Sequence, residues 1–326
     1  MLTAKGIGSN CPDQPVTVIT EIDKIPPIPK GSVVTMGDFD GLHTGHRVLI
    51  DATVARSRQE GLTSVLVTYE PSPKKILKRL TVDSRLTTFS EKQVVLQDTG
   101  LELAVFFPMT AETLKISARS FLRNFLLGRL RMRHIVMGND HHFGHNRRGN
   151  AAYLLAAAKR YGFSVEIVAE QMTLERRTSS SRIRTALQEG NIAAVNAILG
   201  RPYSVAGPVV RGEARGRTLG FPTANLGLDP EKLLPLPGVY YGIARLADGH
   251  GYPAVANLGR KPTAGDHPLG LEIHLLNFAG DLYGSELRFE FMGHIRRERR
   301  FASLDELRTQ IEQDVMFAQQ KFVSLD

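Results

Sequence analysis

The chain has 326 residues, of which 42% are hydrophobic and 23% are charged. This length allows about two domains with their own cores, and the composition is ordinary for a globular protein. No apolar run approaches the roughly 18 residues of a membrane span, and no charged-then-apolar secretory layout is present, so we expect a cytoplasmic protein. The single cysteine, Cys11, excludes an internal disulfide and a thiolate zinc site.

A net charge of +8 and a pI of about 9.6 point to a polyanionic partner. Phosphate-rich small ligands satisfy this charge as well as nucleic acid does. The basic residues are spread along the chain, apart from a cluster at Arg296, Arg297, Arg299 and Arg300. With Glu298 inside it, this cluster is more typical of a solvated face than of an RNA groove. We therefore expect no nucleic-acid partner and no membrane partner.

The first half of the chain alternates short apolar runs with helical stretches. A proline-containing lead-in over residues 1 to about 30 predicts extended chain without a core element. Strands are predicted at 33–36, 64–69, 103–107, 134–138 and 164–170, and helices near 45–60, 90–99, 117–129 and 150–161. Ser90 and Gln93 indicate a capping box for the second helix. This alternation predicts a Rossmann-like parallel sheet with helices on both faces.

The stretch Val33 to His46, VVTMGDFDGLHTGH, joins the first of these strands to a helix. Its glycines predict a tight turn that directs backbone N–H groups and a helix N-terminus toward one point, where a phosphate is favoured. His43 and His46 are three residues apart and lie on one face if the helix begins there. They can donate to phosphate oxygens, or they can be ordinary helix-capping residues.

Two later segments of this half carry similar chemistry. Residues 136–149, VMGNDHHFGHNRRG, follow a predicted strand and are rich in glycine and polar groups. Four histidines near this loop suggest a metal only weakly, because they lack a defined ligand spacing. Residues 178–190 open a helix with hydroxyl groups that can cap it. Arg182 and Arg184 in the same turn add guanidinium groups, and the combination suits phosphate oxygens.

The pattern changes near residue 200, where period-two stretches with turns replace helical runs. Several antiparallel strands and one final helix predict a small β-barrel with a C-terminal helix. Asp248-Gly249 marks a hairpin between two of these strands. The predicted domains are residues 1–186 and 187–326.

Two segments of the second half suggest a separate site. Thr223 and Asn225 are two apart, so in extended chain their oxygens point the same way and suit Mg²⁺, although Pro-Thr-Ala-Asn can also be a plain turn. In the strand-like run 271–278, Glu272 and His274 alternate with apolar residues. A glutamate there is either a surface residue or a base.

Taken together, these strings resemble the bacterial bifunctional riboflavin kinase/FMN adenylyltransferase (FAD synthetase) family. The resemblance runs from Val33 to Asp314, with separate signatures in both halves. It implies that His43 and His46 bind ATP phosphates and stabilise adenylyl transfer. It implies nucleotide or phosphate binding by Gly37, Phe39, Asp40, Gly41, Gly45, Asp140, Arg148, Ser180, Ser181 and Arg184.

In the second half, G-R-x-L-G-F-P-T-A-N resembles the riboflavin kinase signature. It implies that Thr223 and Asn225 coordinate the Mg²⁺ of the nucleotide. A glycine-rich loop with Gly216, Gly220 and Pro222 would cover the phosphates. The match L-E-x-H-L-L-x-F implies that Glu272 accepts the proton of the riboflavin 5′-hydroxyl.

The implied function is phosphorylation of riboflavin to FMN with ATP, followed by adenylylation of FMN to FAD and pyrophosphate. ATP, riboflavin and FMN are the expected partners, flavins are substrate and product, and the oligomeric state is left open. Ser72, His141 and Lys261 depart from the family pattern. A protein with one active half therefore remains an alternative, as do a nucleotidyltransferase for another phosphorylated acceptor and a binding protein without catalysis.

Overall fold

The structure is a computed structural model that describes residues 15–80, 84–212, 220–260 and 269–323. By its internal contacts the chain divides into two units, residues 1–178 and 179–326. The boundary expected between residues 186 and 187 falls inside helix α6 (Ser180–Gln188), which is the first helix of the second unit.

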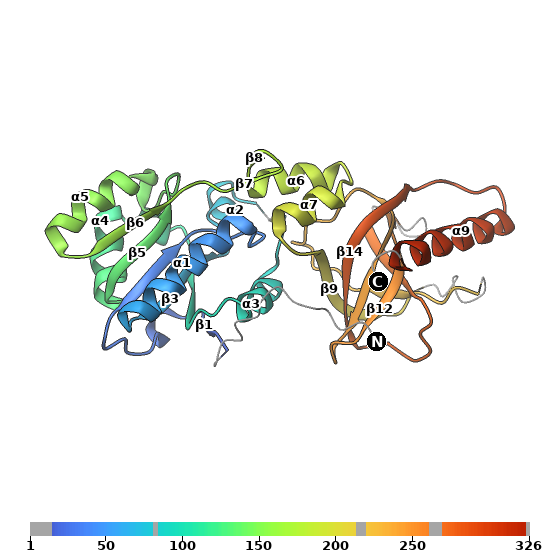
Figure 1. Ribbon diagram of the computed structural model, residues 1–326, viewed down its shortest axis with the longest axis horizontal. Helices are drawn as coiled ribbons and strands as arrows, with labels where there is room; N and C mark the ends of the chain where they lie inside the picture. Colours follow the sequence, from blue (N-terminus) through green and yellow to red (C-terminus); the bar gives the residue numbers. More distant parts are fainter. Residues whose placement is uncertain (1–14, 81–83, 213–219, 261–268, 324–326) are drawn as a thin grey trace. The chain divides into compact units, whose positions relative to one another are not determined.

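The first unit is built on a six-stranded parallel sheet with the strand order β1-β4-β3-β2-β5-β6 (Figure 1). All five predicted strands are present. A sixth, β1, pairs with β4 at the edge of the sheet, so the expectation that the lead-in forms no core element was wrong. A three-residue strand is too short to show an alternating pattern. The strands are β1 (Thr17–Ile19), β2 (Ser32–Met36), β3 (Thr63–Glu70), β4 (Leu103–Pro108), β5 (Met132–Gly138) and β6 (Ser164–Val168).

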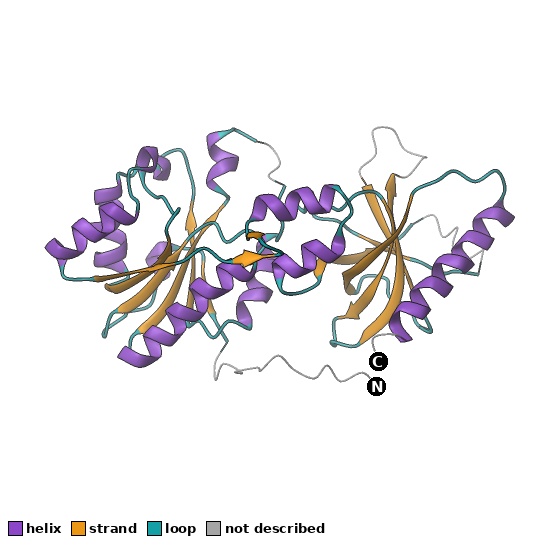
Figure 2. Cartoon of the chain, turned by 45° about the horizontal axis from the view of Figure 1, so that its top comes forward, coloured by secondary structure: helices purple, strands orange, loops and turns teal. Residues whose placement is uncertain are grey.

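Helices cover both faces of this sheet, as the alternation of elements predicts (Figure 2). Successive residues of β3 and β4 face opposite ways and enter two separate apolar clusters. One cluster includes residues of α1 and α3, and the other includes residues of η3, a π-helix, and of α5. The longer helices are α1 (Thr44–Glu60), α3 (Phe89–Gln97), η3 (Phe121–Arg129) and α5 (Ala151–Tyr161).

Short elements complete the first unit. They are η1 (Ile22–Lys24), α2 (Pro73–Leu77), η2 (Thr113–Lys115), α4 (Ala118–Ser120), η4 (His145–Arg147), and the two-stranded ribbon of β7 (Met172–Thr173) and β8 (Arg176–Arg177). The capping box of α3 is formed by Thr88 and Glu91, not by Ser90 and Gln93 as expected. The helix therefore begins at Phe89, with Thr88 as its cap, because the Glu91 side chain accepts from the N–H of Thr88.

The second unit contains a closed barrel with the strand order β10-β13-β12-β11-β14-β9. Every pairing in it is antiparallel, which confirms the predicted barrel. The hairpin at Asp248-Gly249 is present, and Gly249 has the positive φ of 88° that such turns favour. The strands are β9 (Tyr203–Val210), β10 (Ala224–Leu226), β11 (Gly238–Leu246), β12 (Gly251–Arg260), β13 (Leu269–Leu275) and β14 (Glu286–Arg297).

Among the described residues of this unit, the helices are α6, α7 (Ile192–Leu199) and α9 (Leu304–Val323). The side chain of Asn196 joins α7 to the barrel, since it donates to the carbonyl of Phe291 and accepts from the N–H of Tyr203. The C-terminal helix α9 packs on the outside of the barrel, where Ala318 meets Val239 and Val255.

A buried ion pair fastens α9 to β14. Arg296 donates from Nε and Nη2 to both carboxylate oxygens of Asp314, at 2.8 to 3.1 Å. Only 4% of the Asp314 side chain is exposed. Arg296 is therefore not part of a solvated basic face, whereas Arg297, Arg299 and Arg300 are exposed as expected.

Replacing Asp314 with Ala leaves the Arg296 guanidinium without its carboxylate beneath the helix. We expect this change to lower the free energy of unfolding by about 3 kcal/mol. Glu312→Ala is the matched control, because Glu312 pairs with Arg308 at the surface of the same helix and should cost at most about 1 kcal/mol. Urea unfolding measures the free energy of unfolding of both variants. Equal losses in the two would contradict the role of the Arg296–Asp314 ion pair in stability.

Candidate functional site

The turn between β2 and α1 carries the first candidate site. Residues 37–43 connect a fully buried strand to the N-terminus of a 17-residue helix. Three residues of this turn have positive φ: Phe39 at 49°, Gly41 at 86° and Leu42 at 45°. Phe39 and Leu42 carry side chains and rarely adopt this conformation, so the surrounding structure must hold the turn in place.

His43 and His46 lie together at the first turn of α1, as the sequence predicts. The His43 ring caps the helix, because its Nδ1 accepts from the N–H of His46 at 3.2 Å. The neutral ring therefore carries its proton on Nε2, where it is a donor. The two rings stack with centroids 3.6 Å apart. A Cβ at Gly45 would lie 3.2 Å from Nδ1 of His43, so a glycine lets the ring lie against the helix.

The sheet order places this turn where ligands bind in such folds. The chain runs outward from β2 through β3 to β4 and later returns to the other side of β2 as β5. Ligands of parallel sheets bind beyond the strand ends where the order reverses in this way. The turn after β2 and the loop 139–150 after β5 both leave this point of the sheet.

The loop after β5 holds two predicted binding residues and one departure from the family pattern. Asp140 and Arg148 are exposed, and Asp140 pairs with Arg177 of β8. His141 stacks on the buried ring of Phe143, with 13° between the ring planes. Burial lowers the pKa of His141 from 6.5 to about 4, so the ring is neutral at pH 7.

Asp40 is buried and is held by backbone N–H groups. Its Oδ1 accepts from the N–H of Leu86 at 2.9 Å and from that of Thr87 at 3.3 Å. The Thr87 hydroxyl accepts from the N–H of Gly41. The segment that precedes α3 therefore fixes the shape of the turn. The predicted roles of Gly37, Phe39, Asp40 and Gly41 in nucleotide binding stay predictions.

Two further motifs of the sequence are placed as follows. Ser72, which stands where the family has His, caps α2 by accepting from the N–H of Lys75 at 3.2 Å.

Ser180, Ser181 and Arg184 lie in the first turns of α6, whose cap is Ser179. Because α6 belongs to the second unit, their predicted phosphate role also stays a prediction.

The second candidate site is a row of polar residues across three strands of the barrel. Asn225 of β10 is directly opposite Glu272 of β13, and Glu272 is directly opposite Asn257 of β12. Residues paired in this way lie on the same face of a sheet. Their strand neighbours Ala224, Leu271 and Ile273 are buried, so the row is on the outer face of the barrel. Within the described part of the chain, Glu272 has no ion-pair partner.

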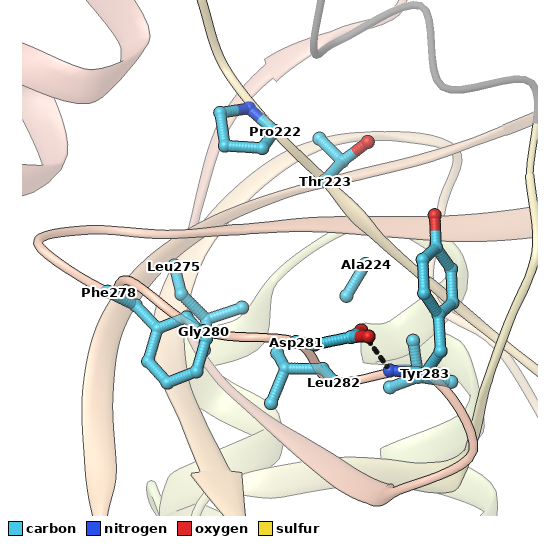
Figure 3. Close-up of a pocket in the computed structure, with 10 residues that line it drawn as sticks. Pro222, Thr223, Ala224, Leu275, Phe278, Gly280, Asp281, Leu282 and Tyr283 are labelled. Atoms are coloured by element: carbon cyan, nitrogen blue, oxygen red, sulfur yellow. Dashed lines mark hydrogen bonds between the residues drawn. The ribbon is translucent and has the colours of Figure 1, made fainter.

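Thr223 comes just before β10 and lines a cavity of about 510 Å³. Figure 3 shows the segment 222–224 along one side of this cavity, and the rings of Phe278 and Tyr283 on either side of Asp281. The Asp281 carboxylate accepts from the N–H of Tyr283 at 3.0 Å, which holds the loop between β13 and β14. A cavity of this size with apolar walls and a few polar groups suits a small ligand.

Sequence reasoning gave no role to three residues that shape this second site. Nδ1 of His274 donates to the carbonyl of Pro222 at 2.8 Å, which holds the segment before β10. Gly212 lies against the Asn225 amide, where a Cβ would be 2.3 Å from its nitrogen. Asn257 completes the polar row. In the sequence, His274 is visible only as the H of L-E-x-H, and Asn257 only as the N of ANLGRKPT. Gly216 and Lys261 lie outside the described residues.

In the part of the chain that the structure describes, no helix is long and apolar enough to cross a bilayer. Among the same residues, no group of three or more His, Cys, Asp and Glu side chains is placed to hold a metal ion.

Comparisons with known proteins match both units. The FAD synthetase family model matches residues 25–182, and the riboflavin kinase family model matches residues 199–322. The chain is 36% identical over 296 residues to a bifunctional riboflavin kinase/FMN adenylyltransferase of Escherichia coli, which covers 90% of this chain and 93% of that protein. Proteins of the same description from Pseudomonas fluorescens and Bacillus subtilis are 36% and 34% identical and cover 92% and 90% of this chain, and 96% and 93% of their own lengths.

A solved structure is similar over nearly the whole chain. It is described as a macrolide-efflux protein from Streptococcus pneumoniae and aligns with a TM-score of 0.83 and 29% identity. The alignment covers 93% of this chain and 98% of that one.

The neutral state of the half-buried His141 ring predicts how the stability of the protein depends on pH. The unfolded chain binds a proton near pH 6.5 and the folded chain only near pH 4, so stability falls as the pH drops from 6.5 to 4. His141→Phe removes this dependence, and its thermal midpoint should fall less than that of the wild type between these pH values. His134 and His294, whose pKa values burial also lowers, remain in both proteins. If the thermal midpoints of the two proteins fell equally over this pH range, the lowered pKa of His141 would be contradicted.

Proposed function

This chain belongs to the bifunctional riboflavin kinase/FMN adenylyltransferase family, and on that premise we propose that it makes FMN and then FAD. The barrel unit transfers the γ-phosphoryl group of ATP to riboflavin. The α/β unit transfers AMP from a second ATP to FMN and releases pyrophosphate. The observation that carries the kinase assignment is the row of Asn225, Glu272 and Asn257 on one face of the barrel.

In the kinase step, the Glu272 carboxylate accepts the proton of the riboflavin 5′-hydroxyl as its oxygen attacks the γ-phosphorus of ATP, and ADP leaves. Support comes from the position of Glu272, which lies between two neutral amides and has no ion-pair partner among the described residues.

We propose that the nucleotide of the kinase step lies along the cavity that Thr223 lines. The Thr223 hydroxyl and the Asn225 carbonyl oxygen would hold the Mg²⁺ that accompanies ATP, since both are the hard oxygen donors that this ion prefers. When bound, Mg²⁺ neutralises charge on the β- and γ-phosphates. Gly220 and Pro222 would cover these phosphates, as the family motif implies.

In the adenylylation step, an oxygen of the FMN phosphate attacks the α-phosphorus of ATP. The donor Nε2–H of His43 and the ring of His46 stabilise the negative charge that builds on the phosphoryl oxygens, and the N-terminus of α1 adds its dipole. No covalent enzyme intermediate is needed. For Asp140, Arg148, Ser180, Ser181 and Arg184 we propose the nucleotide- and phosphate-binding roles that the family motifs imply.

Chromatography of flavins after incubation with ATP and Mg²⁺ tests both activities. Riboflavin in one tube should give FMN and FAD, and FMN in a second tube should give FAD. If riboflavin stops at FMN and FMN is unchanged, only the barrel is active. No conversion in either tube would favour the binding-protein alternative.

Glu272→Gln keeps the size of the side chain and removes the base. We expect riboflavin phosphorylation to slow by about 10²- to 10⁴-fold, while FMN adenylylation stays at its wild-type rate. The measurement is the initial rate of each step with its own substrate. Loss of both activities in a folded variant would contradict two independent sites.

His46→Ala should have the opposite effect. Removal of one group that stabilises transition-state charge should lower kcat for FMN adenylylation by about 10²- to 10³-fold and leave riboflavin phosphorylation intact. An unchanged rate of FAD formation from FMN would disprove the role of this histidine.

A further inference from the structure

A buried lysine lies beneath the turn that carries the two histidines. Lys92 of α3 is 1% exposed. Its Nζ donates to the backbone carbonyl of Asp38 at 2.8 Å and to the hydroxyl of Thr68 at 3.2 Å. Burying an ammonium group is costly unless hydrogen bonds and charges compensate for the lost water. Here the compensation comes from the backbone of the turn itself.

The Asp38 carbonyl is held from two sides. It accepts from the Thr68 hydroxyl at 2.9 Å as well as from Lys92. The next residue in the chain is Phe39, whose φ of 49° is rare for a residue with a side chain. A backbone in such a conformation persists only where its surroundings enforce it. The two hydrogen bonds on the preceding carbonyl enforce the start of the turn.

Phe39 connects this point to the histidines. Its ring is 1% exposed and meets the His46 ring edge to face, with centroids 5.1 Å apart. His46 in turn stacks on His43. A shift of the Asp38–Phe39 peptide therefore moves the Phe39 ring and, through it, both imidazoles.

The charges around Lys92 support an ammonium in this place. Burial lowers the pKa of Lys92 and nearby Arg85 adds to this effect, whereas Asp38, Asp40 and Glu70 raise it. Arg85 is itself paired with Glu70 at 2.7 Å. The three carboxylates around the two cations give the buried group its counter-charge.

We propose that Lys92 is a positioning residue for adenylyl transfer, which holds the Asp38 carbonyl and thereby sets Phe39 and His46. This inference rests on the function proposed for the first unit. The hydrogen bonds of its Nζ go to the Asp38 carbonyl and the Thr68 hydroxyl, so Lys92 acts through the turn. The other anchor of the turn, Asp40 on the N–H groups of Leu86 and Thr87, fixes the following residues and does not replace it.

Lys92→Met keeps most of the length of the side chain and removes the donor. We expect kcat for FMN adenylylation to fall by about 10- to 100-fold, because a misplacement of about 1 Å is sufficient for such a loss. Riboflavin phosphorylation in the same protein should keep its wild-type rate. Leu126→Ala is the matched control: Leu126 of η3 is fully buried in the other apolar cluster of the same unit, which includes no residue of the turn. It should lower the thermal midpoint and leave kcat unchanged.

A double variant separates positioning from general destabilisation. If Lys92 acts through His46, Lys92→Met should lower kcat by less than about twofold in a His46→Ala background. A full and independent loss in that background would overturn the proposal, as would wild-type kcat in a folded Lys92→Met protein.

If Lys92→Met does not fold, Thr68→Val removes the other donor on the same carbonyl. A lower kcat for adenylylation alone supports the proposal, and an unchanged kcat overturns it. Wild-type protein that forms no FAD from FMN would overturn the proposed function and this inference together. Active wild type with an unaffected Lys92→Met variant would overturn the inference alone.

Discussion

Hydrogen bonds from the neighbouring segments to one strained turn are the constraint on which the first unit depends. The turn between β2 and α1 places positive φ on Phe39 and Leu42, which neither residue favours by itself. Tertiary contacts offset this cost: the Asp40 carboxylate binds backbone N–H groups, and Lys92 and Thr68 bind the Asp38 carbonyl. The result is a helix N-terminus with two stacked imidazoles at the point where the strand order reverses.

Strand register has the corresponding role in the barrel. Side chains alternate between the faces of a strand, so a slip of one residue would move Asn225 to the face opposite Glu272. The outer face of β12 is covered at one position and exposed at another. Val255 is covered by α9, whereas Asn257, two residues later, is exposed beside Glu272. The ion pair between Arg296 and Asp314 joins this helix to β14.

Two departures from the family pattern are accommodated by local structure. The Ser72 side chain caps α2, and serine is one of the residues preferred at this position. His141 keeps the flat ring of the residue that it replaces and stacks on Phe143, at the expense of a pKa lowered to about 4. The Lys261 departure lies outside the described residues.

Periodicity and turn residues predicted the five main strands of the sheet, the barrel with its hairpin, and the positions of the motifs, because these signals act over a few neighbouring positions. The tertiary structure alone decided the edge strand β1, the capping of α3 by Thr88, the row of Asn225, Glu272 and Asn257, and the placement of Lys92 under the turn. Lys92 binds residues 24 and 54 positions away in the chain. Partners at such distances leave no local pattern, and only the folded packing brings them together.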